Sequence, residues 1–134
     1  MLKLSKKVEY AIIAIKSIYD QSCTESVSAK VISDEKELSF ELLAKVLQKL
    51  VKAGIIVSSQ GIKGGYRLNH SPNSITLLMI IDAVEKNISL TNCLNKSPEN
   101  AVCSHQNNCC IKNPITKIQT EIESYFNKTT IDKL

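Results

Sequence analysis

The sequence is poor in the side chains on which most enzyme active sites depend. It contains two histidines, and its 13 acidic residues are scattered along the chain. These residues do not form paired catalytic carboxylates, a nucleophile–base–acid triad or a phosphate-binding loop. An enzymatic function is therefore not expected.

Long uncharged hydrophobic runs are also lacking. The N-terminal segment has early lysines, but Lys16 interrupts its apolar stretch, which continues into helical periodicity. This segment therefore predicts neither a signal peptide nor a membrane-spanning helix. We expect a cytoplasmic protein without a membrane partner. Its 134 residues, of which 43% are hydrophobic, are enough for one compact domain.

Apolar residues recur at spacings of three and four in several segments, which predicts amphipathic helices. The first begins near Val8, with Ser5 as its N-cap. The second is short, and Val27, Val31 and Ile32 are expected to face the core from it. The predicted helices span about 8–19, 26–35, 39–53 (closed by Gly54) and 75–86, and the last one opens at Asn113 and Pro114.

A glycine-rich hairpin directly follows the third helix. Strands at 55–59 and 66–68 are expected to flank a turn at 61–65. This order predicts a mainly α fold with a small β-hairpin, namely a winged helix-turn-helix with a C-terminal dimerisation helix. Residues 1–72 would form the DNA-binding region and residues 73–134 the cysteine-loop sensor and dimerisation region, within one compact domain.

The net charge of +4 permits nucleic-acid binding without proving it, so the positions of the basic residues matter more than their number. In a helix-turn-helix, the second helix of the motif enters the major groove, and a wing can reach the minor groove. A polar helix face can also be simply the solvated side, but the hairpin behind this one favours double-stranded DNA as a partner. The expected contacts are Ser39, Glu41, Lys45 and Gln48 in the groove, Lys49 on the phosphate backbone, and Gln60, Lys63 and Arg67 in the wing.

The last predicted helix carries one apolar stripe and has little of its own domain left to pack against. Such a stripe is either the lid of a small core or a dimerisation surface. Its position after the wing favours dimerisation, so a homodimer is expected. The stripe consists of Ile115, Ile118, Ile122, Tyr125 and Phe126.

Four of the five cysteines lie in a polar loop, and three of them, Cys93, Cys103 and Cys109, have nine and five residues between them. Thiols stay reduced in a cytosol, so this cluster favours a metal centre over disulfides. Cys110 adjoins Cys109, and neighbouring side chains rarely reach one metal together, so Cys109 is the expected ligand of that pair. His105, or an acidic residue of a partner subunit, would serve as a fourth ligand.

The spacing leaves the kind of centre open. The loop lacks the paired CxxC motifs of a zinc ribbon, but Cys93, Cys103, His105 and Cys109 would still make a reasonable zinc site. An iron–sulfur cluster with an incomplete or weak fourth ligand would be labile, as a sensor requires. A metal-free thiol switch through Cys109 or Cys110 is a further alternative.

The order of motifs resembles the winged-helix regulators that include the iron–sulfur cluster regulator IscR and the nitric-oxide sensor NsrR. The resemblance covers essentially the whole chain, from LKLSKKVEYAI through the wing motif GIKGGYRL and ITLLMIIDAVE to NKTTIDKL. It implies a homodimer and a two-iron or four-iron cluster held by Cys93, Cys103 and Cys109. It also implies that cluster occupancy governs repression or activation of promoters.

Several positions depart from the family pattern. In IscR-like members a histidine three residues after the last cysteine completes the site, and Lys112 stands there. In NsrR-like members an acidic residue before the tyrosine of the first helix reaches across the dimer, and Glu9 has this position. Glu9 is thus a candidate fourth ligand, with His105 behind it. Gln60 replaces a common arginine and Ala44 a common acidic residue, and either change could alter the preferred DNA site.

Together these features predict a transcription regulator, such as a repressor, that controls cluster-assembly or stress genes. The competing interpretation is a zinc-stabilised winged-helix module that binds protein.

Overall fold

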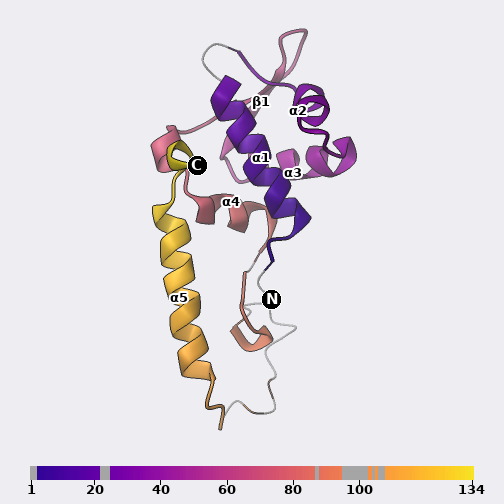
Figure 1. Cartoon of the computed structure of the whole chain (residues 1–134). Coiled ribbons are helices and arrows are strands. Elements are labelled where there is room, and N and C mark those ends of the chain that lie inside the picture. The colour runs from indigo at the N-terminus through magenta and orange to yellow at the C-terminus, as the bar shows by residue number, and fades with distance from the viewer. Residues whose placement is uncertain (1–2, 22–24, 87, 95–102, 104, 106–107) are drawn as a thin grey trace.

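The computed structural model describes residues 3–21, 25–86, 88–94, 103, 105 and 108–134. Most of the predicted cysteine loop, at 95–102, 104 and 106–107, lies outside these residues. The described chain is mainly helical and contains one antiparallel hairpin (Figure 1). Its elements are α1 (Lys6–Gln21), α2 (Ala29–Lys36), α3 (Phe40–Lys52), β1 (Ile56–Ser59), β2 (Gly65–Leu68), α4 (Leu77–Val84) and α5 (Lys112–Lys128), with short 3-10 turns at Pro72–Ser74, Asn92–Leu94 and Ile131–Lys133. The predicted fold class is confirmed.

Side-chain caps fix where three of the helices begin. Ser5 Oγ accepts a hydrogen bond from the backbone N–H of Val8 at 3.4 Å, as predicted for α1. Ser28 caps α2 and Thr76 caps α4 in the same way, each accepting from the N–H three residues on at 3.2 Å. Such caps satisfy N–H groups that have no partner within the helix, which stabilises each start by about 1 kcal/mol.

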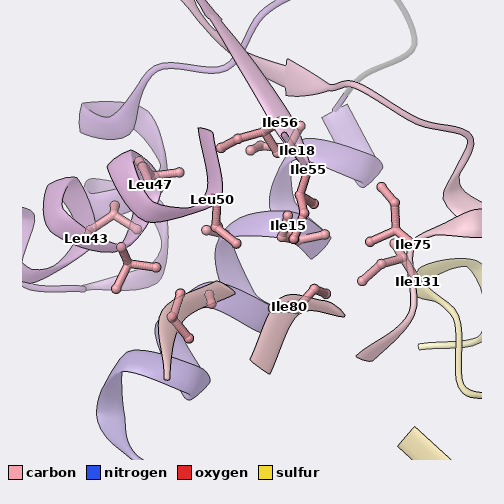
Figure 2. Packing of buried hydrophobic residues seen from close by; sticks show 14 of the residues in the cluster. Ile15, Ile18, Leu43, Leu47, Leu50, Ile55, Ile56, Ile75, Ile80 and Ile131 are labelled. Atoms are coloured by element: carbon pink, nitrogen blue, oxygen red, sulfur yellow. The ribbon is translucent and has the colours of Figure 1, made fainter. Parts of the chain in front are cut away.

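The hydrophobic core lies where α1, α3 and α4 meet (Figure 2). Ile15 and Ile18 of α1 are fully buried, as are Leu50 of α3 and Ile80 of α4. Truncating such a side chain to alanine would cost about 2–5 kcal/mol. The core therefore holds α3, the predicted recognition helix, rigidly against the rest of the fold.

The C-terminal residues return to this core after α5. Ile131 is fully buried, and its N–H donates to Ile75 O at 3.0 Å. The N–H of Leu77 donates to Thr129 O at 2.8 Å. One end of α5 is thus fixed at the start of α4, and the rest of the helix, about 25 Å long at 1.5 Å per residue, extends away from α1–α3 (Figure 1).

The hairpin is joined to the segment before α2. Val27 and Tyr66 exchange both backbone hydrogen bonds, at 2.9 and 2.7 Å, so Val27 forms an isolated antiparallel bridge to β2 of the hairpin. Gly65 lies at this contact, and a Cβ there would be 2.6 Å from the backbone carbonyl of Val27. A glycine is required here because the two backbones approach so closely.

Two details of the predicted second helix are wrong. It begins at Ala29, because Ser28 is its cap and Val27 is extended in the bridge to the hairpin. Val31 was expected to face the core but is 40% exposed, whereas Ile32 is fully buried.

Candidate nucleic-acid interface and cysteine segment

The outer face of α3 presents polar side chains to solvent. Ser39 is the N-cap residue of the helix, and its backbone N–H donates to Tyr10 Oη of α1 at 3.1 Å. Glu41, Lys45 and Gln48 follow at spacings of four and three, so they lie on one face, and all three are exposed. The opposite face of α3 is buried, with Leu43, Val46, Leu47 and Leu50 as its core residues.

Lys49, the predicted phosphate contact, makes a contact within the chain. Its Nζ donates to Val84 O at 2.9 Å, at the C-terminal end of α4. The last carbonyls of a helix have no partner within the helix, and a cation is favourable there. Lys49 therefore connects the outer face of α3 to the end of α4.

The wing carries exposed polar and basic side chains. Gln60, Lys63 and Arg67 are all exposed, and Arg67 lies on β2 opposite Val57 of β1. Within the described ranges, Lys63 and Arg67 take part in no ion pair. Their positive charge is available to an anionic partner such as a phosphate backbone.

Two exposed apolar residues, one at the start of α3 and one at the wing turn, were missed from the sequence. Phe40, the first residue of α3, is 53% exposed, and Ile62 at the wing turn is fully exposed. Phe40 falls outside the inward periodic set of α3, which was the only sign of its exposure. Apolar side chains at such positions can contact thymine methyl groups or base steps.

The cysteine segment contains free thiols. Cys93 lies in the short turn Asn92–Leu94, and its Sγ is 3.1 Å from Thr91 Oγ1. Cys93, Cys103 and Cys109 are half-buried, whereas Cys110 and His105 are exposed. The described residues include no group of three His, Cys, Asp or Glu side chains placed to hold a metal ion. The structure thus provides the expected donors but does not bring them together.

Glu9 lies in the first turn of α1 and is paired with a lysine. Lys6 Nζ is 2.8 Å from Glu9 Oε2. This hydrogen bond, together with the negative charge of Glu9, raises the pKa of Lys6. A metal that used Glu9 as a ligand would bind through Oε1 or displace Lys6 from Oε2.

An open groove of about 1000 Å³ runs between α5, the residues after α4 and the start of the chain. Ile88 and Leu90 line it from the residues after α4, and Ile118 and Tyr125 line it from α5. Ile118 is 45% exposed and Tyr125 is 70% exposed. The predicted stripe on α5 is therefore only partly covered by its own chain.

A three-helix core, an exposed polar helix face and a glycine-dependent wing define a winged-helix DNA-binding protein. The chain belongs to the Rrf2 family. The profile of this family, described as an iron-dependent transcriptional regulator, matches residues 4–134.

Individual relatives agree with this assignment. A Haemophilus influenzae protein named as a candidate HTH-type transcriptional regulator is 33% identical over 133 residues, which is 99% of this chain and 86% of that protein. The HTH-type transcriptional regulator IscR of Vibrio campbellii is 29% identical over 99% of this chain and 77% of its own. The structure of CymR (YrzC), the global cysteine regulator of B. subtilis, is similar with a TM-score of 0.78 and 26% identity, covering 99% of this chain and 95% of that one.

The predicted resemblance is confirmed, and the protein is a DNA-binding transcriptional regulator of the Rrf2 type. Its relatives are named as regulators rather than enzymes. No helix in the described ranges is long and apolar enough to cross a membrane.

Proposed function

We propose that this regulator is a cytoplasmic homodimer whose binding to promoters is controlled by an iron–sulfur cluster held by Cys93, Cys103 and Cys109. The observation that carries the proposal is that these three half-buried thiols are free and lie between the end of α4 and the start of α5. The genes controlled would be those of cluster assembly or of nitrosative and oxidative stress.

On DNA, α3 would enter the major groove and the wing would follow the adjacent backbone. Glu41 can accept from a cytosine amino group, and Gln48 can pair with adenine. Lys45 would add a further groove contact, and Lys63 and Arg67 would neutralise phosphates or enter the minor groove. The exposure of all five side chains supports these roles. Ser39 at the start of α3 and Gln60 before the wing turn complete the proposed surface.

The second copy would pack on α5. A soluble protein rarely leaves a contiguous apolar groove open, and such a groove marks an interaction site. Ile118 and Tyr125 on α5 would fill the groove of the partner, because a two-fold interface uses the same patch on both subunits. Two recognition helices would then face half-sites one DNA turn apart, about 34–36 Å.

The donor set suits a soft metal centre. Thiolates favour zinc and iron–sulfur clusters, and metal binding is coupled to the folding of the segment that carries its ligands. Cys93, Cys103 and Cys109 would hold the cluster, with Glu9 or His105 as the fourth ligand. The cluster, when bound, would supply redox and ligand-exchange chemistry through which a signal alters site occupancy.

Control would work as a population shift. Closure of the cysteine segment around a cluster would favour one arrangement of α5 and the residues after α4, and through them one spacing of the two recognition helices. Couplings of this kind usually change affinity by about 5- to 150-fold.

A second candidate is a thiol switch without metal. The free thiols of Cys109 and Cys110, which are neighbours in the chain, favour it. Cys109 and the adjacent exposed Cys110 would be the reactive pair. In this case oxidation, rather than iron, would change DNA affinity.

Replacing Cys93, Cys103 and Cys109 together with alanine tests the proposal. DNA affinity is measured with and without anaerobic reconstitution by iron and sulfide. The wild-type affinity should change at least about fivefold on reconstitution, and the triple variant should not respond. Cys110→Ala is the matched control and should respond like the wild type. A triple variant whose DNA affinity responds to reconstitution as strongly as that of the wild type would overturn cluster control. If the DNA affinity of the wild type responds to an oxidant and Cys110→Ala loses this response, the thiol switch is favoured.

A further inference from the structure

The one residue of α5 that is buried is a glutamine. Gln119 is 8% exposed, although α5 is 17 residues long and its apolar stripe is partly open to solvent. Burying an amide is unfavourable unless its donors and acceptor are all bonded. Gln119 must therefore have specific partners to be buried at this position.

These partners are backbone atoms of the segment that leads to Cys93. The N–H of Leu90 donates to Gln119 Oε1 at 2.9 Å, and Gln119 Nε2 donates to Ile88 O at 2.6 Å. Nε2 also donates to Glu123 Oε1 at 2.7 Å, one turn further along α5. The Gln119 amide thus hydrogen-bonds the backbone of Ile88 and of Leu90, two positions apart, in the way that a neighbouring β-strand would. Its orientation is determined, because the reversed amide would place a donor against the Leu90 N–H and an oxygen against two acceptors.

A short rigid path connects this amide to the first thiol. The turn after Leu90 is closed by a hydrogen bond from Leu94 N to Thr91 O at 3.1 Å. Inside the turn, Thr91 Oγ1 lies 3.1 Å from Cys93 Sγ. The thiol is therefore three residues from a backbone group that α5 holds directly.

The other end of the same segment is held by the recognition helix. Lys49 of α3 bonds Val84 O, and the segment runs from there to Leu90 and Cys93. The chain between α4 and Cys93 is thus attached to α3 by one side chain and to α5 by another.

We propose that Gln119 is a positioning residue that fixes Cys93 relative to α5, the helix proposed to form the dimer. This rests on the proposed function only for its biological purpose, since the placement itself is a property of the metal-free chain. Without the Gln119 amide, the residues from Ile88 to Cys93 separate from α5 and the thiol becomes freely accessible.

The test uses the full-length, reduced, metal-free protein. Gln119→Met keeps the length of the side chain and removes all three hydrogen bonds. Two measurements are made: amide hydrogen exchange at Leu90, and the rates at which iodoacetamide alkylates each cysteine, read by mass spectrometry. Gln21→Met is the matched control, because Gln21 also bonds a carboxylate, Glu35, at 2.7 Å, but on the exposed surface of α1.

Two neutral hydrogen bonds to backbone together shift a local opening equilibrium by about 5- to 140-fold. Leu90 exchange and Cys93 alkylation should both accelerate by this factor in Gln119→Met, while Cys110 alkylation stays unchanged. Faster Leu90 exchange with unchanged Cys93 alkylation would overturn the proposal. So would an equal acceleration at all cysteines, because Gln119 would then only stabilise the fold in general.

Exchanging the amide and the carboxylate between Gln119 and Glu123 tests whether the protection of Cys93 can be restored. In Gln119→Glu the carboxylate can still accept from the Leu90 N–H, but it cannot donate to Ile88 O and it faces Glu123. Adding Glu123→Gln returns an amide donor to the pair, so Cys93 alkylation in the double variant should move back towards the wild-type rate. The absence of any recovery would count against the hydrogen-bonding mechanism. If Cys93 protection depends on Gln119 while the DNA affinity of the wild type does not respond to iron and sulfide, or the triple cysteine variant responds like the wild type, cluster control fails and this inference stands.

Discussion

Gly65→Ala separates the wing from the rest of the DNA-binding fold. A Cβ at residue 65 would lie 2.6 Å from both the carbonyl carbon and the carbonyl oxygen of Val27, and 2.9 Å from Ser28 N. All three are backbone atoms, so no rotamer change can relieve the overlap. The hairpin would have to move away from Val27.

The cost follows from what this movement breaks. Val27 and Tyr66 exchange two backbone hydrogen bonds, at 2.9 and 2.7 Å. Each contributes about 0.5–1.5 kcal/mol net, so their loss costs about 1–3 kcal/mol. Residual strain brings the expected loss to about 2–4 kcal/mol, which is a large part of the 5–15 kcal/mol that stabilises a typical domain.

Gly54→Ala is the control. Gly54 has φ of 75° at the end of α3, but nothing lies within 4 Å of an added Cβ. An alanine there meets only the conformational penalty, about 1–2 kcal/mol. Urea unfolding measures both variants, and titration of a promoter fragment measures DNA affinity. We expect Gly65→Ala to be the less stable variant and to bind DNA more weakly than Gly54→Ala. Equal stability of the two would refute the argument from close backbone approach.

Three further predictions concern charge and association. Lys63→Ala and Arg67→Ala should each weaken DNA binding across sequences and lower the slope of log affinity against log salt by about one, measured by titration at several salt concentrations; an unchanged slope would exclude the phosphate contact. Tyr125→Glu should convert a dimer to a monomer in sedimentation while each subunit stays folded, as read from a cooperative melting transition. A persistent dimer would contradict the proposed interface. Lys49→Met leaves Val84 O without its partner and should lower the free energy of unfolding by about 1–3 kcal/mol, whereas a residue that only contacts phosphate would leave it unchanged.

Local patterns predicted the regular elements of this fold. The periodicity of α3 and the glycine after it placed the helix correctly, because a helix buried on one face imposes a spacing that is visible in sequence. The Ser5 cap is likewise a local interaction. The hairpin was recognised from its glycines, of which Gly65 proved to be required by a close backbone contact.

Contacts between distant residues were not predictable in the same way. Val27 was assigned to a helix, but its bridge to Tyr66, 39 residues later, holds it in an extended conformation. Gln119 lies beside the apolar stripe of α5, where a polar side chain is usually exposed, and only its hydrogen bonds to the backbone of Ile88 and Leu90 explain its burial. Lys49 was expected to contact the phosphate backbone of DNA, and its hydrogen bond to Val84 O of α4 had no sign in the sequence.

The cysteine site was only partly accessible to sequence reasoning. The number and type of donors can be read from the chain, but their assembly depends on closure of the segment and on any ligand from a second subunit. The proposed roles of Cys93, Cys103, Cys109, Glu9 and His105 therefore remain predictions.

The most direct test of the central claim is the cofactor content of protein purified under strict anaerobiosis. Iron, acid-labile sulfide and zinc are assayed per chain together with the visible spectrum, for the wild type and for the variant with Cys93, Cys103 and Cys109 replaced by alanine. Cluster control predicts a coloured wild type with iron and sulfide in near-equal amounts, and a colourless variant that contains neither. A colourless wild type that carries stoichiometric zinc, or a folded dimer without metal, would contradict it.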